Sequence, residues 1–185
     1  MEFKKSSRVG MIMDVETAIK TRRAIRMFDD IPVPDKVVTR ILEAGRLAPS
    51  SKNSQPVRMI VIRDKEKLKR LSKMTYSGDC LASAPLAIAL ITEDAKLPNV
   101  DSARAVQNMV MVAWSLGIGC VWITNFWEKG KEILGVPMTG RFRLITVIPF
   151  GYPHPSVQRA HGKRIRLPIE DVAFDEKWGK PWDSQ

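Results

Sequence analysis

Residues 85–92 read PLAIALIT, and residues 101–116 read DSARAVQNMVMVAWSL. The first stretch is a short, almost continuous apolar run, which is typical of a strand that is buried on both faces. The second stretch carries apolar residues on nearly every side of a helix, and it therefore predicts a helix at the centre of the protein. A buried strand followed by a buried helix indicates a layered fold that combines a sheet with helices.

Both flanks of these stretches continue the alternation. Periodic apolar residues predict further strands at residues 57–62, 120–123 and 144–150, and further helices at residues 14–22, 34–48, 65–73 and 127–134. Asp14, Pro34 and Gly117 suit a helix cap, a helix start and a helix end. About four strands separated by helices predict an α/β or α+β sandwich in one domain over residues 13–185, preceded by a flexible N-terminus at residues 1–12.

Length and composition exclude several classes of protein. A chain of 185 residues with 44% hydrophobic and 27% charged residues suits one globular domain rather than a disordered chain. No apolar run approaches the roughly 20 residues of a membrane-spanning helix, and the polar N-terminus lacks the apolar core of a signal peptide. We therefore expect a cytoplasmic protein. Two cysteines and two histidines are too few for a dedicated metal site, so we expect no bound metal.

The net charge of +10 draws attention to two groups of arginines. Arg22, Arg23 and Arg26 follow the first predicted helix, and Arg164 and Arg166 lie in the C-terminal tail. A guanidinium presents a planar fork of donors that matches phosphate oxygens, which indicates an anionic partner. Two simpler explanations stay open, namely cations placed at a helix C-terminus and a solvated basic tail. A nucleic-acid-binding protein is the alternative function that the charge alone would favour.

A polar loop and the tail are the other unusual segments. Residues 48–56 read APSSKNSQP and place hydroxyl and amide groups between a predicted helix and a predicted strand, where an ordinary polar turn is the alternative. Residues 151–185 have no core pattern of their own but include Trp178 and Trp182. Exposed tryptophans are unfavourable, so we expect the tail to wrap around a second copy of the chain. Packing of the tail on its own body is the alternative.

Motifs that would place the chemistry on side chains are absent. The sequence has no GxGxxG after a strand, no GxxxxGK[ST] and no GxSxG, and its two late histidines form no recognisable set with a serine or a cysteine. If the protein is an enzyme, we expect its reactive atoms to belong to a cofactor. We therefore predict no catalytic side chain.

Four motifs occur in an order that resembles the FMN-dependent nitroreductase family. They are RRAIRMF at residues 22–28, APSSKNSQP at residues 48–56, GIGCVWI at residues 117–123 and RIRLP at residues 164–168, and the resemblance extends over residues 14–172. It implies an α+β sandwich whose central sheet is mixed but mostly antiparallel and is flanked by helices. It also implies a homodimer in which the C-terminal tail extends onto the partner chain and two FMN molecules lie at the interface.

The resemblance also assigns contacts to FMN. The first motif is implied to contact its phosphate, ribityl chain and ring, and the tail arginines to clamp its phosphate. Residues 49–51 are implied to cover the flavin of the partner chain, Asn53 to hydrogen-bond the ring, and backbone groups after the glycine turn to approach the ring's reactive edge. Two arginine groups that converge on one phosphate predict FMN rather than FAD. The implied cofactor-binding residues are Arg22, Arg23, Ala24, Arg26, Pro49, Ser50, Ser51, Asn53, Thr124, Asn125, Arg164 and Arg166.

The implied function is that of an oxidoreductase that takes a hydride from NADH or NADPH and reduces nitroaromatics, quinones or a related small acceptor by a ping-pong mechanism. The sequence departs from the family at Ala24, where serine is usual, and at Val57, where tryptophan is common. Residues 72–84 form a shorter segment than in larger members, which implies a more open site. Enzymes that resemble this family also catalyse dehalogenation and flavin fragmentation, and these reactions are alternatives.

Overall fold

The computed structural model describes residues 13–126, 128–158 and 165–182. Within these residues, one sheet has four strands in the order β1-β2-β4-β3, with bounds Val57–Ile62 for β1, Leu86–Glu93 for β2, Gly119–Cys120 for β3 and Phe142–Gly151 for β4. All three neighbouring pairs are antiparallel, and an isolated bridge between Ala24 and Cys120 is parallel. The expectation of a mostly antiparallel sheet in an α+β fold is confirmed.

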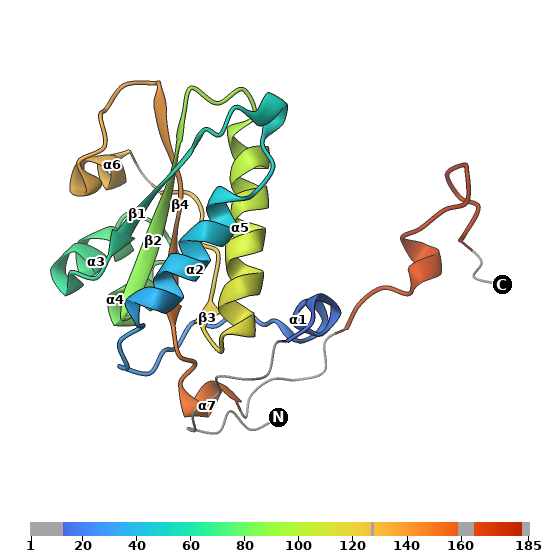
Figure 1. Cartoon of the computed structure of the whole chain (residues 1–185), viewed down its shortest axis with the longest axis horizontal. Helices are drawn as coiled ribbons and strands as arrows, with labels where there is room; N and C mark the ends of the chain where they lie inside the picture. The colour runs from blue at the N-terminus through green and yellow to red at the C-terminus, as the bar shows by residue number, and fades with distance from the viewer. Residues whose placement is uncertain (1–12, 127, 159–164, 183–185) are drawn as a thin grey trace.

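Helices cover both faces of this sheet (Figure 1). The helices α2 and α5 pack on one face, and α3, α4 and α6 pack on the other. The described part of the chain also has two short 3-10 turns, at Ser51–Asn53 and Ile169–Asp171. The helix bounds are Val15–Thr21 for α1, Asp35–Arg46 for α2, Lys65–Ser72 for α3, Asp79–Ser83 for α4, Pro98–Ser115 for α5, Lys129–Leu134 for α6 and Pro155–Gln158 for α7.

Strand β2 is buried on both faces because it lies between the two layers of helices. Leu86 and Leu90 belong to the core shared with α2 and α5, whereas Ala87 and Ala89 belong to the core shared with α3 and α4. Successive side chains of a strand point to opposite faces, so a continuous apolar run supplies both cores at once. This is the physical reason that PLAIALIT produces a sandwich rather than a one-sided sheet.

Helix α5 is the central helix that the sequence predicts, and most of its inward positions are buried. A Cβ atom at Gly45 of α2 would lie 2.8 Å from the sulfur of Met109, so a larger residue there would force the Met109 side chain to move. The helix starts at Pro98 rather than at Asp101, because proline is well suited to the first turn of a helix. It ends before Gly117, whose φ of 77° only glycine adopts readily.

Several segments differ from the expectations. Strand β3 comprises Gly119–Cys120 rather than residues 120–123, because the chain leaves the sheet after Cys120 and later carbonyls bond side chains instead. Helix α6 begins at Lys129 rather than at residue 127. Helices α4 and α7 have five and four residues, which is too short for an apolar period to reveal them.

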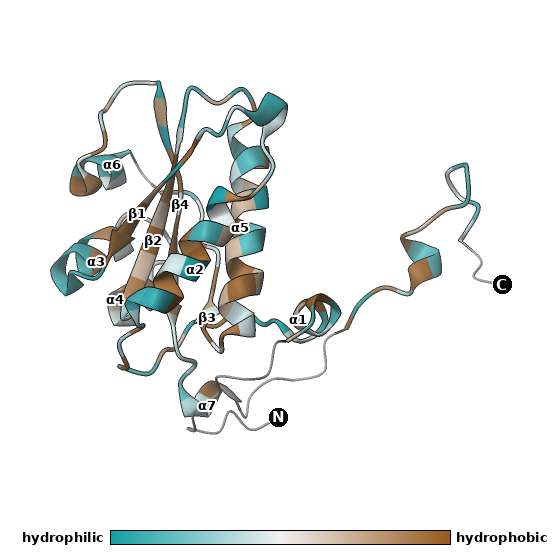
Figure 2. Cartoon of the chain, viewed as in Figure 1, coloured by the Kyte–Doolittle hydropathy of each residue, from teal (hydrophilic) through white to brown (hydrophobic). Residues whose placement is uncertain are grey.

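The chain has two parts of different character, which we call the body (residues 13–158) and the arm (residues 165–182). The arm leads away from the body (Figure 1), and its hydrophobic residues lie in the open (Figure 2). Within the arm, the rings of Phe174 and Trp178 lie 4.6 Å apart and the Trp182 N–H donates to the Ala173 carbonyl. The arm thus folds on itself, and its wrapping around a second copy of the chain stays a prediction.

Two further expectations concern the extent of the chain. The flexible terminus expected at residues 1–12 lies outside the described residues, and the single-domain boundary stays a prediction. Among the described helices, none combines the length and the apolar character that crossing a membrane would require.

Candidate functional site

The first candidate segment is a strap, which we define as residues 22–28 between α1 and α2. The Ile25 N–H donates to the Cys120 carbonyl at 2.9 Å, and the Asp29 N–H donates to the Tyr152 carbonyl at 2.8 Å. A Cβ atom at Gly119 would lie 2.6 Å from Ile25, so the glycine of the GIGCVWI motif lets the strap lie directly on the sheet. Ile25 is buried whereas Ala24 and Arg26 are exposed, so the strap turns the Arg26 side chain outward.

Two of the strap arginines, Arg23 and Arg26, have different surroundings. The Arg23 guanidinium donates to the carbonyls of Lys20, Thr21 and Arg22 at 3.4, 3.0 and 3.2 Å, so it caps the C-terminus of α1. For Arg23, the simpler explanation therefore holds, namely that the cation lies at a helix C-terminus and interacts with its carbonyls. Arg26 is exposed and makes no hydrogen bond or ion pair within the described residues. Arg26 is therefore the strap cation best placed to meet an anion.

Two buried cysteines lie beneath this basic edge. Burial raises the pKa of the Cys120 thiol to about 12, and the positive charge of Arg22 opposes that rise. Burial likewise raises the pKa of the Cys80 thiol, opposed by the charge of Arg26. Both thiols are free and stay protonated at neutral pH, so neither is an activated nucleophile. The described residues contain no group of three metal-ligating side chains.

The second candidate segment is the pinned loop, which we define as residues 121–126 directly after β3. The Thr146 hydroxyl donates to the Ile123 carbonyl at 2.5 Å, and the Thr75 hydroxyl donates to the Thr124 carbonyl at 2.9 Å. Thr124 and Asn125 are exposed, and Asn125 has a φ of 61°. The loop begins where the strap is fastened to Cys120, so these two segments lie side by side at one edge of the sheet.

The third candidate segment is the polar loop, which we define as residues 49–55. The Ser51 N–H donates to Asp101 Oδ1 at 3.0 Å, and the Gln55 N–H donates to the Ser50 hydroxyl at 2.8 Å. Asn53 is exposed and has a positive φ of 55°, and Lys52 and Gln55 also have positive φ values. Asp101 is only 2% exposed, so a buried carboxylate at the start of α5 anchors this loop.

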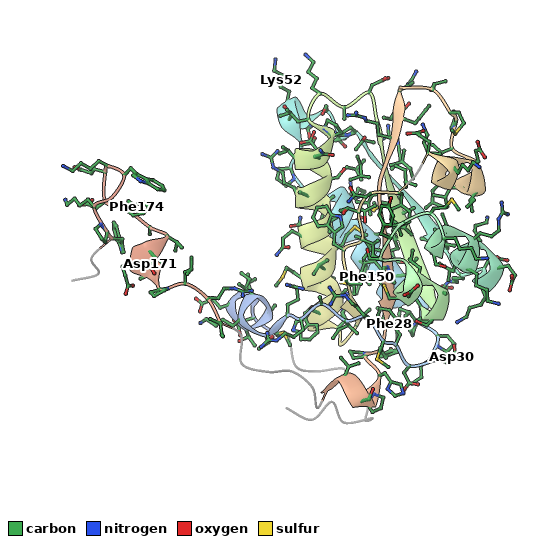
Figure 3. All side chains as sticks on the ribbon, turned by 180° about the vertical axis from the view of Figure 1, so that it is seen from behind. Phe28, Asp30, Lys52, Phe150, Asp171 and Phe174 are labelled. Atoms are coloured by element: carbon green, nitrogen blue, oxygen red, sulfur yellow. The ribbon has the colours of Figure 1, made fainter. Side chains whose placement is uncertain are left out.

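Within one chain, the polar loop and the strap lie far apart. The polar loop is tied to Asp101 at the start of α5, whereas Trp114 Nε1 near the end of α5 donates to the Thr21 hydroxyl beside the strap. These two anchors are about 20 Å apart at a rise of 1.5 Å per residue. Figure 3 shows Lys52 and Phe28 at opposite ends of this helix. A site that uses both segments therefore needs a second chain.

The tail arginines complete the predicted set. Arg166 is exposed, and its guanidinium donates to the neighbouring Ile165 carbonyl at 2.9 Å. Arg164 lies outside the described residues.

The structure also reveals three residues that the motifs do not contain, namely Thr75, Thr146 and Asp101. The sequence offers no local signal for them, because their partners are 49, 23 and 50 positions away.

Comparisons with known proteins agree with this architecture. The family model described as Nitroreductase family matches residues 19–79 and 78–152. An Archaeoglobus fulgidus relative, whose name joins NADH dehydrogenase and NAD(P)H nitroreductase, is 35% identical over 147 residues, which cover 73% of this chain and 83% of the relative.

Solved structures share the fold. An FMN-dependent nitroreductase from Clostridium difficile has 30% sequence identity and a TM-score of 0.76, with coverage of 86% of this chain and 98% of its own. A Desulfovibrio desulfuricans protein solved in complex with FMN has 29% identity and a TM-score of 0.76, with coverage of 89% and 97%. The fold, the order of the motifs and the family match lead to one conclusion: the chain belongs to the nitroreductase family.

Proposed function

We propose that this protein is an FMN-dependent oxidoreductase that takes a hydride from NADH or NADPH and passes the electrons to a nitroaromatic, a quinone or a related small acceptor. The observation that carries the proposal is the meeting of the strap and the pinned loop at one edge of the sheet. The strap supplies Arg22 and Arg26, and the pinned loop supplies the backbone of Thr124 and Asn125.

The residues at this edge fit FMN. A terminal phosphate requires cations, and Arg26 is exposed with no ion pair among the described residues. A flavin ring requires hydrogen-bond donors along its polar edge, and the N–H groups of Thr124 and Asn125 donate to no residue that the structure describes. The C. difficile neighbour is FMN-dependent, and the D. desulfuricans neighbour holds FMN. FMN is accordingly the cofactor, with NAD(P)H as the electron donor.

The remaining contacts follow the resemblance and require a homodimer. Residues Pro49–Ser51 and Asn53 of one protomer would cover the flavin bound at the partner's strap, since α5 separates these segments within one chain. Arg164 and Arg166 would close on the phosphate from the tail. The exposed apolar residues of the arm support this arrangement, because a partner surface would remove them from water.

We assign no acid, base or nucleophile among the described residues of this edge, so the proposed task of the protein is to bind and to orient. When bound, FMN supplies the redox chemistry, accepting a hydride and releasing electrons to the acceptor. The strap holds the anionic end of the cofactor, and the pinned loop places N–H donors where charge develops. Donor and acceptor would meet the same flavin in turn, which is the basis for proposing a ping-pong mechanism.

The proposal places the enzyme in the cytoplasm and assigns it neither a metal nor a nucleic acid. The two cysteines are free and buried, which agrees with a reducing compartment. The basic charge would serve the cofactor phosphate rather than a polynucleotide. Nucleic-acid binding, dehalogenation and flavin fragmentation are the competing functions.

The test begins with the purified protein and its bound flavin. We expect a yellow dimer from which heat releases FMN, identified by its mass. Steady-state rates at several NADH or NADPH and quinone concentrations should give parallel double-reciprocal lines, the pattern of a ping-pong mechanism. A colourless protein that takes up no FMN but binds DNA or RNA with steep salt dependence would instead establish the nucleic-acid alternative.

A further inference from the structure

Two threonine hydroxyls hold consecutive carbonyls of the pinned loop. Thr146 bonds the Ile123 carbonyl at 2.5 Å, and Thr75 bonds the Thr124 carbonyl at 2.9 Å. Both threonines are buried, at 0% and 8% exposure. Leaving a buried hydroxyl without a hydrogen-bond partner costs free energy. The two bonds are therefore maintained in the folded protein, and they define the orientation of two successive peptide groups.

The orientation of these carbonyls also determines where the N–H groups point. No cis peptide bond occurs in the described chain, and in a trans peptide the carbonyl and the following N–H point in opposite directions. When Thr75 holds the Thr124 carbonyl, the Asn125 N–H must point away from Thr75. Thr146 imposes the same condition on the Thr124 N–H through the Ile123 carbonyl.

These two N–H groups are available as donors. Neither bonds an acceptor among the described residues, and both belong to exposed residues. The left-handed conformation of Asn125, with φ of 61°, turns the chain at this point. Asparagine tolerates that region better than most residues. The loop is therefore built to present donors outward rather than to satisfy them internally.

The segment that carries Thr75 is itself held tightly. A Cβ atom at Gly78 would lie 2.0 Å from the Ser72 carbonyl oxygen, so only glycine allows the short turn between α3 and α4 to close. Thr75 sits within this turn, between Ser72 and Gly78. Its hydroxyl reaches the pinned loop from a rigid support, which is what a positioning residue requires.

We infer, on the basis of the proposed function, that Thr75 and Thr146 are positioning residues that aim the N–H groups of Asn125 and Thr124 at the cofactor ring. The reduced ring carries more negative charge than the oxidised ring, and an N–H donor stabilises the more negative form. The two hydroxyls thereby raise the reduction potential of the bound cofactor, although neither touches it.

The test replaces Thr75 with valine, which keeps the shape and removes the hydroxyl, and measures the potential of bound FMN. We expect Thr75→Val to shift the balance between oxidised and reduced flavin about tenfold toward the oxidised form, about 30 mV lower for a two-electron couple. Thr75→Ser should restore most of the wild-type potential. Thr92→Val is the matched control, because Thr92 is buried at 1% exposure and its hydroxyl has no partner within the described chain.

A measurement on the unmutated protein keeps the inference testable if Thr75→Val does not fold. In a sample labelled with 15N-asparagine, the Asn125 amide signal should shift and its exchange with solvent should slow when FMN is added. An unperturbed Asn125 amide, or an unchanged potential in Thr75→Val, would overturn the positioning role while FMN binding itself stands. A wild-type protein that binds no FMN would overturn the proposed function as well.

Discussion

In the body, Ile88 and Leu90 are completely buried between two layers of helices, whereas in the arm Ile165 and Trp178 keep 86% and 88% of their surface exposed. The body forms a buried apolar core from its own sequence, although some of its large apolar side chains, such as Leu47 and Tyr76 at 64% and 90% exposure, remain on the surface. The arm makes a small local fold and leaves the same kinds of residue in water, where they gain nothing from burial. The difference indicates that the body folds by itself and that the arm needs another surface, which we propose to be the partner chain.

Removal of the arm is the strongest test of this difference. A chain that ends at residue 158 should fold, because the core lies in the body, but it should be monomeric and bind FMN at least about 100-fold more weakly. Circular dichroism, sedimentation and fluorescence titration with FMN check the three expectations. A truncated chain that remains a dimer with full FMN content would remove the arm from the site.

A paired substitution compares the two regions directly. Leu90→Ala opens a cavity between the layers and should lower the free energy of unfolding by about 2–5 kcal/mol. Trp178→Ala should leave the unfolding of the body nearly unchanged and should instead weaken the dimer about tenfold, since tryptophans contribute strongly to interfaces. Urea unfolding and sedimentation at several concentrations measure both. Equal unfolding costs would contradict the distinction between body and arm.

The arm arginine should have a smaller but specific effect. Arg166→Ala should weaken FMN binding about 10- to 100-fold, since a charged hydrogen bond contributes about 1.5–3 kcal/mol. Arg166→Lys should recover only part of the loss, because an ammonium keeps the charge without the planar fork. The exposed Arg40 of α2 provides the control, and Arg40→Ala should leave FMN affinity unchanged. The measurement is the quenching of FMN fluorescence by the apo-protein.

The buried Cys120 thiol should make the folding stability of the body depend on pH. Burial raises the pKa of Cys120 to about 12 from an ordinary 9.0, so above pH 9 the unfolded chain releases a proton that the folded chain keeps. Folding stability therefore decreases as pH rises from about 9 to about 12. Between pH 8 and pH 10 the wild type should lose about 1.4 kcal/mol more than Cys120→Ala. Urea unfolding of both proteins at the two pH values measures this difference, and parallel losses would contradict the buried, protonated thiol.

The parts of the fold that were predictable depend on short-range patterns. Asp14 caps α1 by accepting from the Thr17 N–H at 2.9 Å, and β1 has the bounds Val57–Ile62 that its apolar run predicts. Helix α4 and the early end of β3 were missed, because a helix of five residues has no measurable period and a strand ends where its partner's hydrogen bonds end. The candidate segments were predictable from motifs, and their contacts with FMN remain predictions.

By itself, the sequence determined the α+β sandwich, the segments that carry the motifs and the family to which they belong, because apolar periodicity and capping act over a few residues. Tertiary structure decided the rest. It turned Arg23 to a helix end while leaving Arg26 exposed, and it placed the polar loop and the strap at opposite ends of α5. It also oriented two carbonyls of the pinned loop through the hydroxyls of Thr75 and Thr146, which are 49 and 23 positions away in the sequence. Such contacts depend on how distant elements pack, and no local pattern of residues encodes that packing.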